Sequence, residues 1–140
     1  MLKTAVIGVG YLGRFHAQKY ASIGFSDLVG VVDIDHENGK KVAEELNVEF
    51  FPDYNEIIDK VDAVSIVVPT IFHYEIAKVF LESNIHVLLE KPFAAKIEEA
   101  KILEKISNER NLCLQIGHLE RFNSVFLEFH KDIEKPKYIE

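Results

Sequence analysis

Short apolar runs that alternate with longer segments of helical period are the feature of this sequence that most limits its fold. Predicted strands cover residues 3–8, 28–32, 49–51, 63–68, 85–89 and 112–116, and predicted helices cover residues 11–23, 36–46, 54–59, 72–83 and 97–111. This alternation predicts an α/β fold with a parallel sheet. Because most strands are almost entirely apolar, we expect helices on both faces of the sheet.

Composition places the chain among ordinary globular domains. Its 140 residues are 48% hydrophobic and 28% charged, which fits a single domain with one core. The net charge of −7 opposes binding to nucleic acid or to an anionic membrane surface. The longest uncharged stretch, residues 63–74, contains Pro69 and is too short to span a bilayer.

The cellular location follows from the single cysteine and the N-terminal residues. Cys113 cannot form an intramolecular disulfide, and its place in the apolar run 112–116 predicts a small core residue. The apolar stretch 4–9 is too short for a secretory signal and continues into glycines. We therefore expect a protein of the cytosol, that is, a cytoplasmic one.

A glycine-rich loop follows the first predicted strand and leads into the first predicted helix. Its sequence is Gly8-Val9-Gly10-Tyr11-Leu12-Gly13, a G-x-G-x-x-G pattern. In this context Gly8 allows a tight turn, Gly10 lets a pyrophosphate approach the backbone, and Gly13 lets the helix pack close to the strand. The anion would meet backbone N–H groups at the positive end of the helix dipole.

An acidic residue supports this interpretation. Asp33 ends the second predicted strand, at the offset where a carboxylate accepts hydrogen bonds from the adenosine ribose. A carboxylate there repels a 2′-phosphate, and Ile34, Asp35 and His36 provide no arginine to hold one. The sequence therefore predicts NAD(H) as cofactor in preference to NADP(H). The competing interpretation makes the glycines turn formers and Asp33 a strand terminator.

A charged pair follows the fifth predicted strand, where the chain reads Glu90-Lys91-Pro92. This position lies at the carboxyl edge of the sheet, where open α/β folds bind ligands. Alternation along an extended backbone sends Glu90 and Lys91 to opposite faces. A desolvated lysine beside a nicotinamide can donate or accept a proton, because burial lowers its pKa towards neutrality. Position alone fits a solvated lysine at a strand end equally well.

Taken together, these residues resemble the Gfo/Idh/MocA oxidoreductases, and in particular their N-terminal nucleotide-binding domain. The resemblance covers nearly the whole chain, and the Glu-Lys-Pro element is its most specific part. It rests on the loop 8–13, Val31-Val32-Asp33, Val68-Pro69-Thr70 followed by His73, Glu90-Lys91-Pro92, and Gly117-His118-Leu119-Glu120-Arg121-Phe122-Asn123. It implies a Rossmann-type, doubly wound parallel sheet of six strands.

The resemblance also implies roles for individual residues. Lys91 would be catalytic, contacting the substrate hydroxyl near the nicotinamide, and Pro69 and Thr70 would line the cofactor crevice. His73 could reach the crevice or cap its helix, and we expect Thr70 to cap that helix. The cofactor-binding residues that we expect are Gly8, Gly10, Tyr11, Leu12, Gly13, Asp33, Pro69, Thr70, His73, Glu90 and Lys91.

The segment 117–123 bears on the substrate. Glu120 and Arg121 lie where the family lines the substrate pocket, although a salt bridge at a helix start explains them equally well. The His118 variant of this segment is similar to members acting on nucleotide-linked amino sugars, such as UDP-N-acetylglucosamine 3-dehydrogenases.

Domain boundaries follow from the same resemblance. Family members carry a second α/β domain that supplies most of the substrate site, and we expect this chain to lack that domain. Residues 1–134 would form the cofactor domain, and residues 135–140 would begin a truncated second one. We therefore expect the isolated chain to bind NAD(H) without turning over sugars.

Apolar residues of helical period after the sixth strand predict one more helix, with the aromatic residues Phe122, Phe126 and Phe129 on one face. We expect this face to pack on the sheet, and we expect a dimer or larger assembly because some apolar surface would remain uncovered. His16, His36, His86 and His130 show no metal-ligand spacing, so we expect no metal and read them as surface or core residues.

The sequence therefore predicts the NAD(P)-binding domain of an oxidoreductase that transfers a hydride between a nicotinamide and the hydroxyl of a sugar or nucleotide sugar. One alternative is a non-catalytic module that binds or senses NAD(H). Another is a methyltransferase-like domain that binds S-adenosylmethionine, against which Gly13 and Glu90-Lys91-Pro92 argue.

Overall fold

The sheet is parallel and has six strands, as the alternation of apolar runs predicts. The computed structural model describes residues 1–129, and within them the strand order is β3-β2-β1-β4-β5-β6. The strands are β1 (Leu2–Ile7), β2 (Ser26–Val32), β3 (Glu49–Phe51), β4 (Ala63–Ile66), β5 (His86–Leu89) and β6 (Leu114–Ile116). All neighbouring strands pair in parallel, which confirms the α/β, doubly wound prediction.

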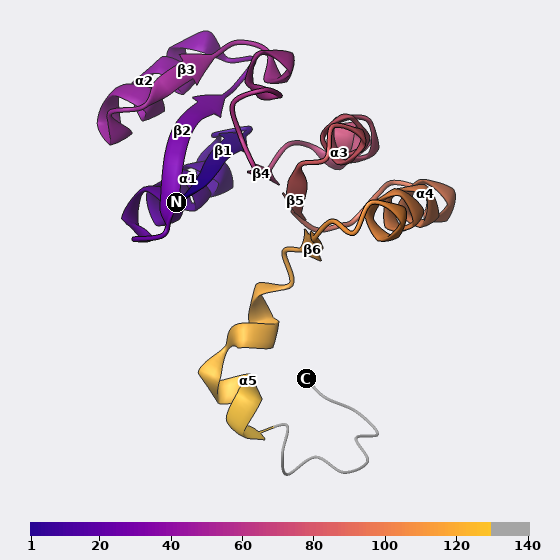
Figure 1. Ribbon diagram of the computed structural model, residues 1–140. Coiled ribbons are helices and arrows are strands. Elements are labelled where there is room, and N and C mark those ends of the chain that lie inside the picture. The colour runs from indigo at the N-terminus through magenta and orange to yellow at the C-terminus, as the bar shows by residue number, and fades with distance from the viewer. Residues whose placement is uncertain (130–140) are drawn as a thin grey trace.

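Helices cover the sheet from both sides (Figure 1). They are α1 (Tyr11–Ser22), α2 (His36–Leu46), α3 (His73–Glu82), α4 (Ile97–Glu109) and α5 (Ser124–Phe129), with 3-10 turns η1 (Tyr54–Ile57), η2 (Thr70–Phe72) and η3 (Leu119–Phe122). Helices α1 and α2 pack on the half formed by β1, β2 and β3, whereas α3 packs on β4 and β5 and α4 packs on α3. No helix in the described part is long and apolar enough to cross a membrane.

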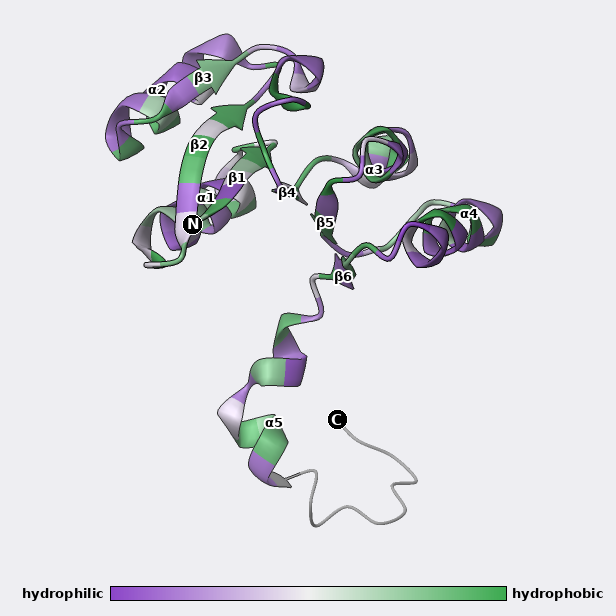
Figure 2. Ribbon diagram, viewed as in Figure 1, coloured by the Kyte–Doolittle hydropathy of each residue, from purple (hydrophilic) through white to green (hydrophobic). Residues whose placement is uncertain are grey.

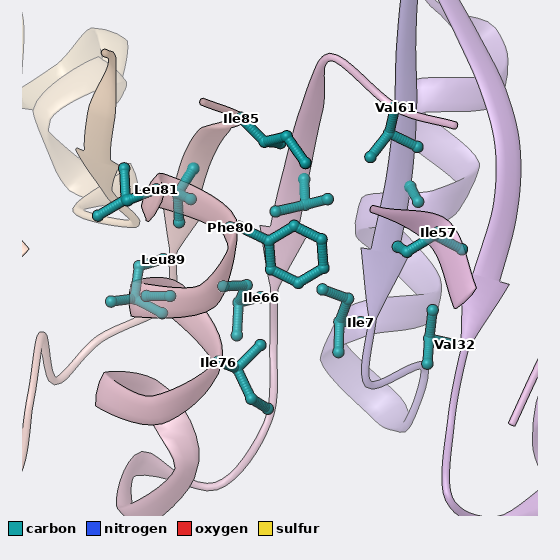
Figure 3. Packing of buried hydrophobic residues seen from close by; sticks show 14 of the residues in the cluster. Ile7, Val32, Ile57, Val61, Ile66, Ile76, Phe80, Leu81, Ile85 and Leu89 are labelled. Atoms are coloured by element: carbon teal, nitrogen blue, oxygen red, sulfur yellow. The ribbon is translucent and has the colours of Figure 1, made fainter. Parts of the chain in front are cut away.

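The sheet has an apolar core on each of its two faces. Alternation along β1 sends Ala5 and Ile7 into one core and Val6 into the other. The larger core centres on Phe80 of α3, which is fully buried against strand residues such as Ile66 (Figure 3). Burying a side chain of this size stabilises a fold by about 1.5–3 kcal/mol, so α3 is held firmly against β4 and β5.

The order of the strands sets where a ligand can bind. The chain runs β1, β2, β3 in one direction and then crosses to β4, β5, β6 in the other. The connections that leave the carboxyl ends of β1 and β4 therefore turn to opposite faces. A crevice forms at such a switch point, between the loop after Ile7 and the loop after Ile66.

One face of the edge strand β6 is open, and this finding corrects the prediction for Cys113. This residue is exposed, not a core residue. Leu112 and Leu114 point towards the larger core, so Cys113 and Gln115 point to the opposite side of the edge strand, where both are exposed. An apolar run at a sheet edge therefore did not imply burial on both faces.

Phe122, one of the aromatic residues predicted to face the sheet after the sixth strand, does not pack on it. Figure 1 shows η3 and α5 extending away from it, and Figure 2 shows hydrophobic residues on α5. Phe122 is 73% exposed, so the prediction that this side chain packs on the sheet is wrong. The expectations for His130 and for residues 135–140 lie outside the described residues.

Two helix starts also differ from the prediction. The segment 54–59 forms only the 3-10 turn η1, whose start Asp53 caps by accepting a hydrogen bond from the Asn55 backbone N–H. Thr70 does not cap the helix that carries His73. It begins the turn η2, and α3 starts three residues later with no side-chain cap.

Candidate functional site

The glycine-rich loop between β1 and α1 has the geometry that its sequence predicts. Gly8 has a φ of +81°, a conformation that other residues rarely adopt. A Cβ on Gly13 would overlap the carbonyl oxygen of Gly8, so only glycine lets α1 approach the strand this closely. A Cβ on Gly10 would meet nothing within 4 Å. The space in front of Gly10 is therefore open to a ligand.

The first turn of α1 faces this space. Backbone N–H groups at the start of a helix have no intrahelical partner and carry a partial positive charge. No acidic side chain lies in the first turn of α1 to compete for them. Tyr11 is 87% exposed and Leu12 is also exposed, so both side chains remain accessible beside the loop. The turn can accept an anion such as a phosphate.

Asp33 joins the glycine-rich loop to the end of β2. Its Oδ2 accepts a hydrogen bond from the Val9 backbone N–H at 2.8 Å, and its Oδ1 accepts one from the Asp35 N–H at 2.9 Å. The Asn38 side chain donates to the Val9 carbonyl at 2.9 Å. A carboxylate has about four acceptor positions, so Asp33 can still accept hydrogen bonds from a ligand while it holds the loop.

An open pocket of about 460 Å³ lies next to Asp33. Its lining consists of Ile7, Gly8, Val32, Asp33, Ile34, Pro52, Asp53, Tyr54, Val68, Phe72, Glu75 and Ile76. The walls are mainly apolar, its three charged residues are all acidic, and it contains no lysine or arginine. Burial, with a smaller effect of the Glu75 and Asp53 charges, raises the pKa of Tyr54. The pocket suits a flat, uncharged group attached to an anion held elsewhere.

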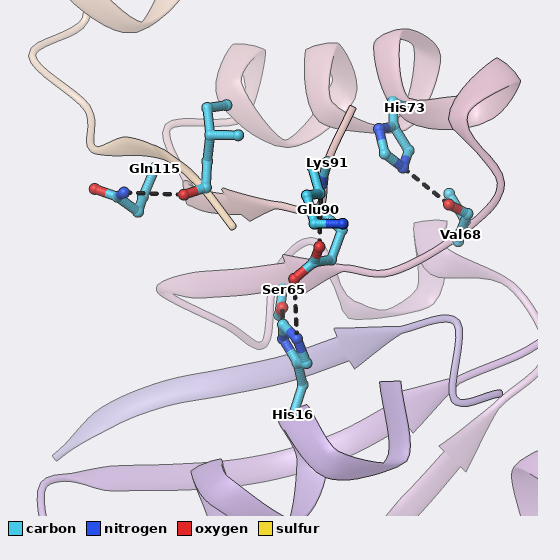
Figure 4. A network of polar contacts seen from close by, with 8 residues as sticks. His16, Ser65, Val68, His73, Glu90, Lys91 and Gln115 are labelled. Carbon is cyan, nitrogen blue, oxygen red and sulfur yellow. Dashed lines mark hydrogen bonds and ion pairs between the residues drawn. The ribbon is translucent and has the colours of Figure 1, made fainter. Parts of the chain in front are cut away.

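Glu90 and Lys91 follow β5 and point to opposite faces, as the strand alternation predicts. Glu90 is only 5% exposed, whereas Lys91 is exposed. The Lys91 backbone N–H donates to Oε2 of Glu90 at 3.0 Å (Figure 4). The buried carboxylate therefore fixes the backbone from which the Lys91 side chain projects.

A half-buried histidine contacts Glu90 from α1. Nε2 of His16 lies 3.3 Å from Oε1 of Glu90, and its Nδ1 lies 2.7 Å from the Ser65 hydroxyl (Figure 4). Desolvation lowers the pKa of His16 below its ordinary 6.5, although the Glu90 charge partly opposes the shift. The favoured form is thus a neutral imidazole, whose Nε2 is the polar atom beside Oε1 of Glu90, an oxygen with no hydrogen-bond partner among the described residues.

Two further residues complete the surroundings of Glu90. Tyr20 of α1 is hydrogen-bonded to Ser65, and burial raises the pKa of its hydroxyl. Gly117 follows β6, and a Cβ at that position would overlap the Glu90 carboxylate. The absence of a side chain at Gly117 therefore leaves room for a buried charged group.

The loop after β4 brings the remaining predicted cofactor residues to the same edge. Pro69 is exposed and Thr70 is half-buried, and the pocket wall includes their neighbours Val68 and Phe72. His73 is buried, with both ring nitrogens close to backbone carbonyls. His73 neither caps α3 nor faces the pocket. Because the side chain is buried, it exposes no ring atom for the predicted contact with a cofactor.

The predicted substrate residues lie elsewhere. Glu120 and Arg121 belong to η3, which leaves the sheet after β6, and both are exposed. Glu120 accepts a hydrogen bond from the Asn123 side chain at 2.8 Å, and no ion pair with Arg121 forms within residues 1–129. In the described residues the two side chains thus stand apart from the crevice, and their role in substrate binding stays a prediction.

Sequence reasoning missed the residues that support Glu90. His16 was expected to be a surface or core residue, and Ser65 and Tyr20 were not singled out. One signal was present, because Ser65 is a polar residue inside the otherwise apolar run 63–68 and is fully buried. A buried hydroxyl in a central strand requires a partner, but the partner itself could not be named.

Comparisons with known proteins agree with this geometry. The family model described as the oxidoreductase family with an NAD-binding Rossmann fold matches residues 2–118. A UDP-N-acetylglucosamine 3-dehydrogenase from Acidithiobacillus ferrooxidans is 44% identical over 140 residues, which cover 99% of this chain and 44% of that protein. The chain thus spans less than half the length of this curated relative.

Solved structures show the same fold. A structure of the Acidithiobacillus ferrooxidans enzyme matches 94% of this chain and 43% of its own, with a TM-score of 0.88. GenD2 from gentamicin A biosynthesis, in complex with NAD, matches at a TM-score of 0.92 with 27% identity, over 96% of this chain and 39% of its own. Scyllo-inositol dehydrogenase from Lactobacillus casei, with NAD(H) and scyllo-inositol bound, matches at 0.87 with 28% identity, over 95% of this chain and 40% of its own.

Proposed function

The chain belongs to the Gfo/Idh/MocA oxidoreductase family, whose model is that of an NAD-binding Rossmann fold, and from this premise we propose that it binds NAD(H) in the crevice after β1 and β4. We further propose that it is the cofactor-binding part of an enzyme that moves a hydride between the nicotinamide and a hydroxyl of a sugar or nucleotide sugar. The observation that carries the proposal is the open space at Gly10, bounded by the first turn of α1 and by Asp33.

The residues present fit the cofactor. The glycine-rich loop and the first turn of α1 would hold the pyrophosphate, because the backbone N–H groups at the start of the helix have no intrahelical partner and Gly10 adds no side chain. Asp33 would accept hydrogen bonds from the adenosine ribose, and the apolar pocket would take the adenine. Pro69 and Thr70 would line the same crevice. When bound, the nicotinamide ring supplies or accepts the hydride.

Lys91 would handle the hydroxyl proton of the substrate. Its ammonium group can hydrogen-bond an alcohol and, when neutral, Nζ can take the proton as a general base. Glu90 does not face the crevice, so its proposed part is to hold the Lys91 backbone through the 3.0 Å hydrogen bond. The two residues therefore have separate tasks, although they are adjacent in the chain.

NAD(H) is the proposed cofactor in preference to NADP(H). The ribose end of the pocket contains Asp33, with Asp53 and Glu75 in the same walls. A 2′-phosphate would bring about two negative charges towards these carboxylates, and the lining residues offer no cation to balance them. We therefore expect NADPH to bind more weakly than NADH.

The proposed substrate class is a nucleotide-linked amino sugar. Its support is the 44% identity to a UDP-N-acetylglucosamine 3-dehydrogenase, which exceeds the 32% identity to a glucose-6-phosphate 3-dehydrogenase from Bacillus subtilis. Because the chain spans 44% of the first relative, we propose that turnover also requires a further protein segment, equivalent to the part of that relative which this chain does not cover. Glu120 and Arg121 are the proposed contributions of this chain to the substrate side.

Cofactor binding is tested by titrating the purified protein with NADH and NADPH, followed by fluorescence and calorimetry. We expect NADH to bind at least about tenfold more tightly, which corresponds to about 1.4 kcal/mol, and we expect Gly10→Val to abolish binding. Asp33→Ala should narrow the preference for NADH over NADPH. Asp59→Asn, which neutralises a carboxylate outside the pocket, should leave that preference unchanged. Binding of neither nucleotide would contradict the proposal.

Turnover is tested separately, with UDP-N-acetylglucosamine and NAD⁺ added to the same protein. We expect no NADH formation from the 140-residue chain alone, even where NADH binds. Lys91→Met should leave the NADH affinity within about twofold, because the proposed task of Lys91 concerns the substrate proton. Clear dehydrogenase activity of the chain alone would contradict the part of the proposal that requires a further segment.

A further inference from the structure

His73 occupies an unusual position between the two loops that border the crevice. It is the first residue of α3, and only 1% of its surface is exposed. One ring nitrogen reaches the loop after β4, as Figure 4 shows, and the other reaches the segment after β5. The imidazole therefore lies between loops that are connected along the chain only through the whole of α3 and β5.

Both ring nitrogens meet carbonyl oxygens. Nε2 lies 2.8 Å from the Val68 carbonyl oxygen, and Nδ1 lies 2.9 Å from the Pro92 carbonyl oxygen. A carbonyl oxygen only accepts hydrogen bonds, and a neutral imidazole has one N–H. Two hydrogen bonds at these distances therefore need a proton on each nitrogen. The amino end of α3 and the burial of the ring oppose a positive charge there, and two charge-assisted hydrogen bonds favour it.

The two carbonyls belong to segments with proposed functions. Val68 directly precedes Pro69 and Thr70, which would line the cofactor crevice, and Pro92 directly follows Lys91. On the opposite face of the sheet, the Glu90 carboxylate holds the Lys91 backbone N–H. The Lys91 segment is thus restrained from both faces, and His73 supplies the restraint on the α3 side.

We propose that His73 is a positioning residue that donates a hydrogen bond from each ring nitrogen, and so fixes the Lys91 segment relative to the loop that lines the cofactor crevice. The positioning role of His73 rests on the proposed function, whereas the pair of hydrogen bonds from its ring does not. The ring is buried, so the inference assigns His73 no contact with cofactor or substrate.

The double hydrogen bond is tested by nuclear magnetic resonance of the ¹⁵N-labelled protein at neutral pH. Long-range correlation spectra distinguish protonated from unprotonated ring nitrogens. His86 is the internal reference, because its Nδ1 accepts a hydrogen bond from the Cys113 backbone N–H and so carries no proton. We expect two protonated nitrogens for His73 and one for His86, with assignments from His73→Gln and His86→Gln. A single protonated nitrogen in His73 would overturn the proposal.

The coupling between loops is tested with the same two variants, each first checked for folding by circular dichroism. His86→Gln is the matched control, since His86 begins β5 at the end remote from the crevice. In His73→Gln we expect the backbone amide resonances of Thr70 and Lys91 to shift together, and neither to shift in His86→Gln. If His73→Gln folds and leaves both resonances unchanged, the proposal is wrong.

Nucleotide binding separates this inference from the proposed function. We expect His73→Gln to weaken NADH binding by about tenfold, the effect of one lost charge-assisted hydrogen bond, and His86→Gln to leave it unchanged. If the unmodified protein binds no nucleotide, the proposed function fails, and the ring-nitrogen spectra still decide whether His73 bridges the loops. If NADH binds and His73→Gln binds it equally well, the positioning role is wrong.

Discussion

The glycine-rich loop and the Glu90-Lys91-Pro92 segment lie at the same edge of the sheet, but different forces hold them. The loop is shaped by the lack of side chains, since a Cβ at Gly8 or Gly13 would overlap backbone atoms. The segment is shaped by buried polar side chains that come from α1 on one face and from α3 on the other. We conclude that sterics fix the cofactor side of the site and buried hydrogen bonds fix the Lys91 side.

The largest effect on stability should come from adding a side chain to the glycine-rich loop. Gly13→Ala places a Cβ against the Gly8 carbonyl oxygen, a backbone atom that cannot move aside. We expect it to lower the free energy of unfolding by at least about 3 kcal/mol, as measured by urea denaturation, and to abolish NADH binding.

Gly10→Ala is the matched control for Gly13→Ala. Its Cβ would enter open space, so the free energy of unfolding should change by less than about 1 kcal/mol while NADH affinity still falls. Equal loss of stability in the two variants would contradict the conclusion that Gly10 leaves space for the ligand whereas Gly13 allows α1 to pack on the strand.

A smaller effect on stability should come from crowding the buried Glu90 side chain. Gly117→Ala pushes a methyl group against the end of the Glu90 side chain. That side chain can shift, at the expense of its contacts with His16 and the Lys91 N–H, so we expect a loss of about 1–3 kcal/mol in denaturation experiments. Gly24→Ala, with nothing within 4 Å of the added Cβ, should be close to neutral. A neutral Gly117→Ala would mean that Glu90 is not tightly held.

The contact between His16 and the buried Glu90 should also make stability depend on pH. Because the pKa of His16 in the folded protein is lowered, chiefly by desolvation, the unfolded chain binds this proton first as pH falls. The resulting stabilisation is complete above pH 6.5 and is lost as the pH falls through the folded-state pKa. We expect His16→Gln to reduce the loss of folding stability between about pH 7 and 5, measured by denaturation at each pH.

Glu90→Gln sharpens the same test. The Glu90 charge raises the pKa of His16 against the effect of burial, so its removal should lower that pKa further in an NMR titration. An increase would show that His16 and Glu90 are not in contact.

The smallest effect on stability should come from an exposed ion pair between α1 and α2. Arg14 of α1 and Glu45 of α2 form an ion pair, and this contact together with a hydrogen bond from Gln18 lowers the pKa of Glu45. Exposed pairs contribute little and are screened by salt. We expect Glu45→Gln to lower the melting temperature slightly, and the difference to disappear in about 1 M NaCl. A large, salt-independent loss would contradict this contrast with the pair of His16 and Glu90.

Sequence reasoning was most accurate where the physics is local. The alternation of strands and helices led to the correct sheet, and β3 and α2 have the predicted bounds. It failed where burial depends on distant elements. Cys113 was expected in the core because its neighbours are apolar, and Phe122 was expected on the sheet because of helical spacing. Neither pattern shows whether another element covers that face.

The sequence by itself determined the parallel α/β fold, the glycine-rich loop and the acidic residue beside it. Those features depend on spacing within a few tens of residues and on the conformational limits of single residues. Only the tertiary structure decided that His16 pairs with Glu90 and that His73 lies between Val68 and Pro92. The physical reason is that a buried hydrogen bond requires two groups to meet at about 3 Å, and the packing of α1 and α3 on the sheet sets those meetings.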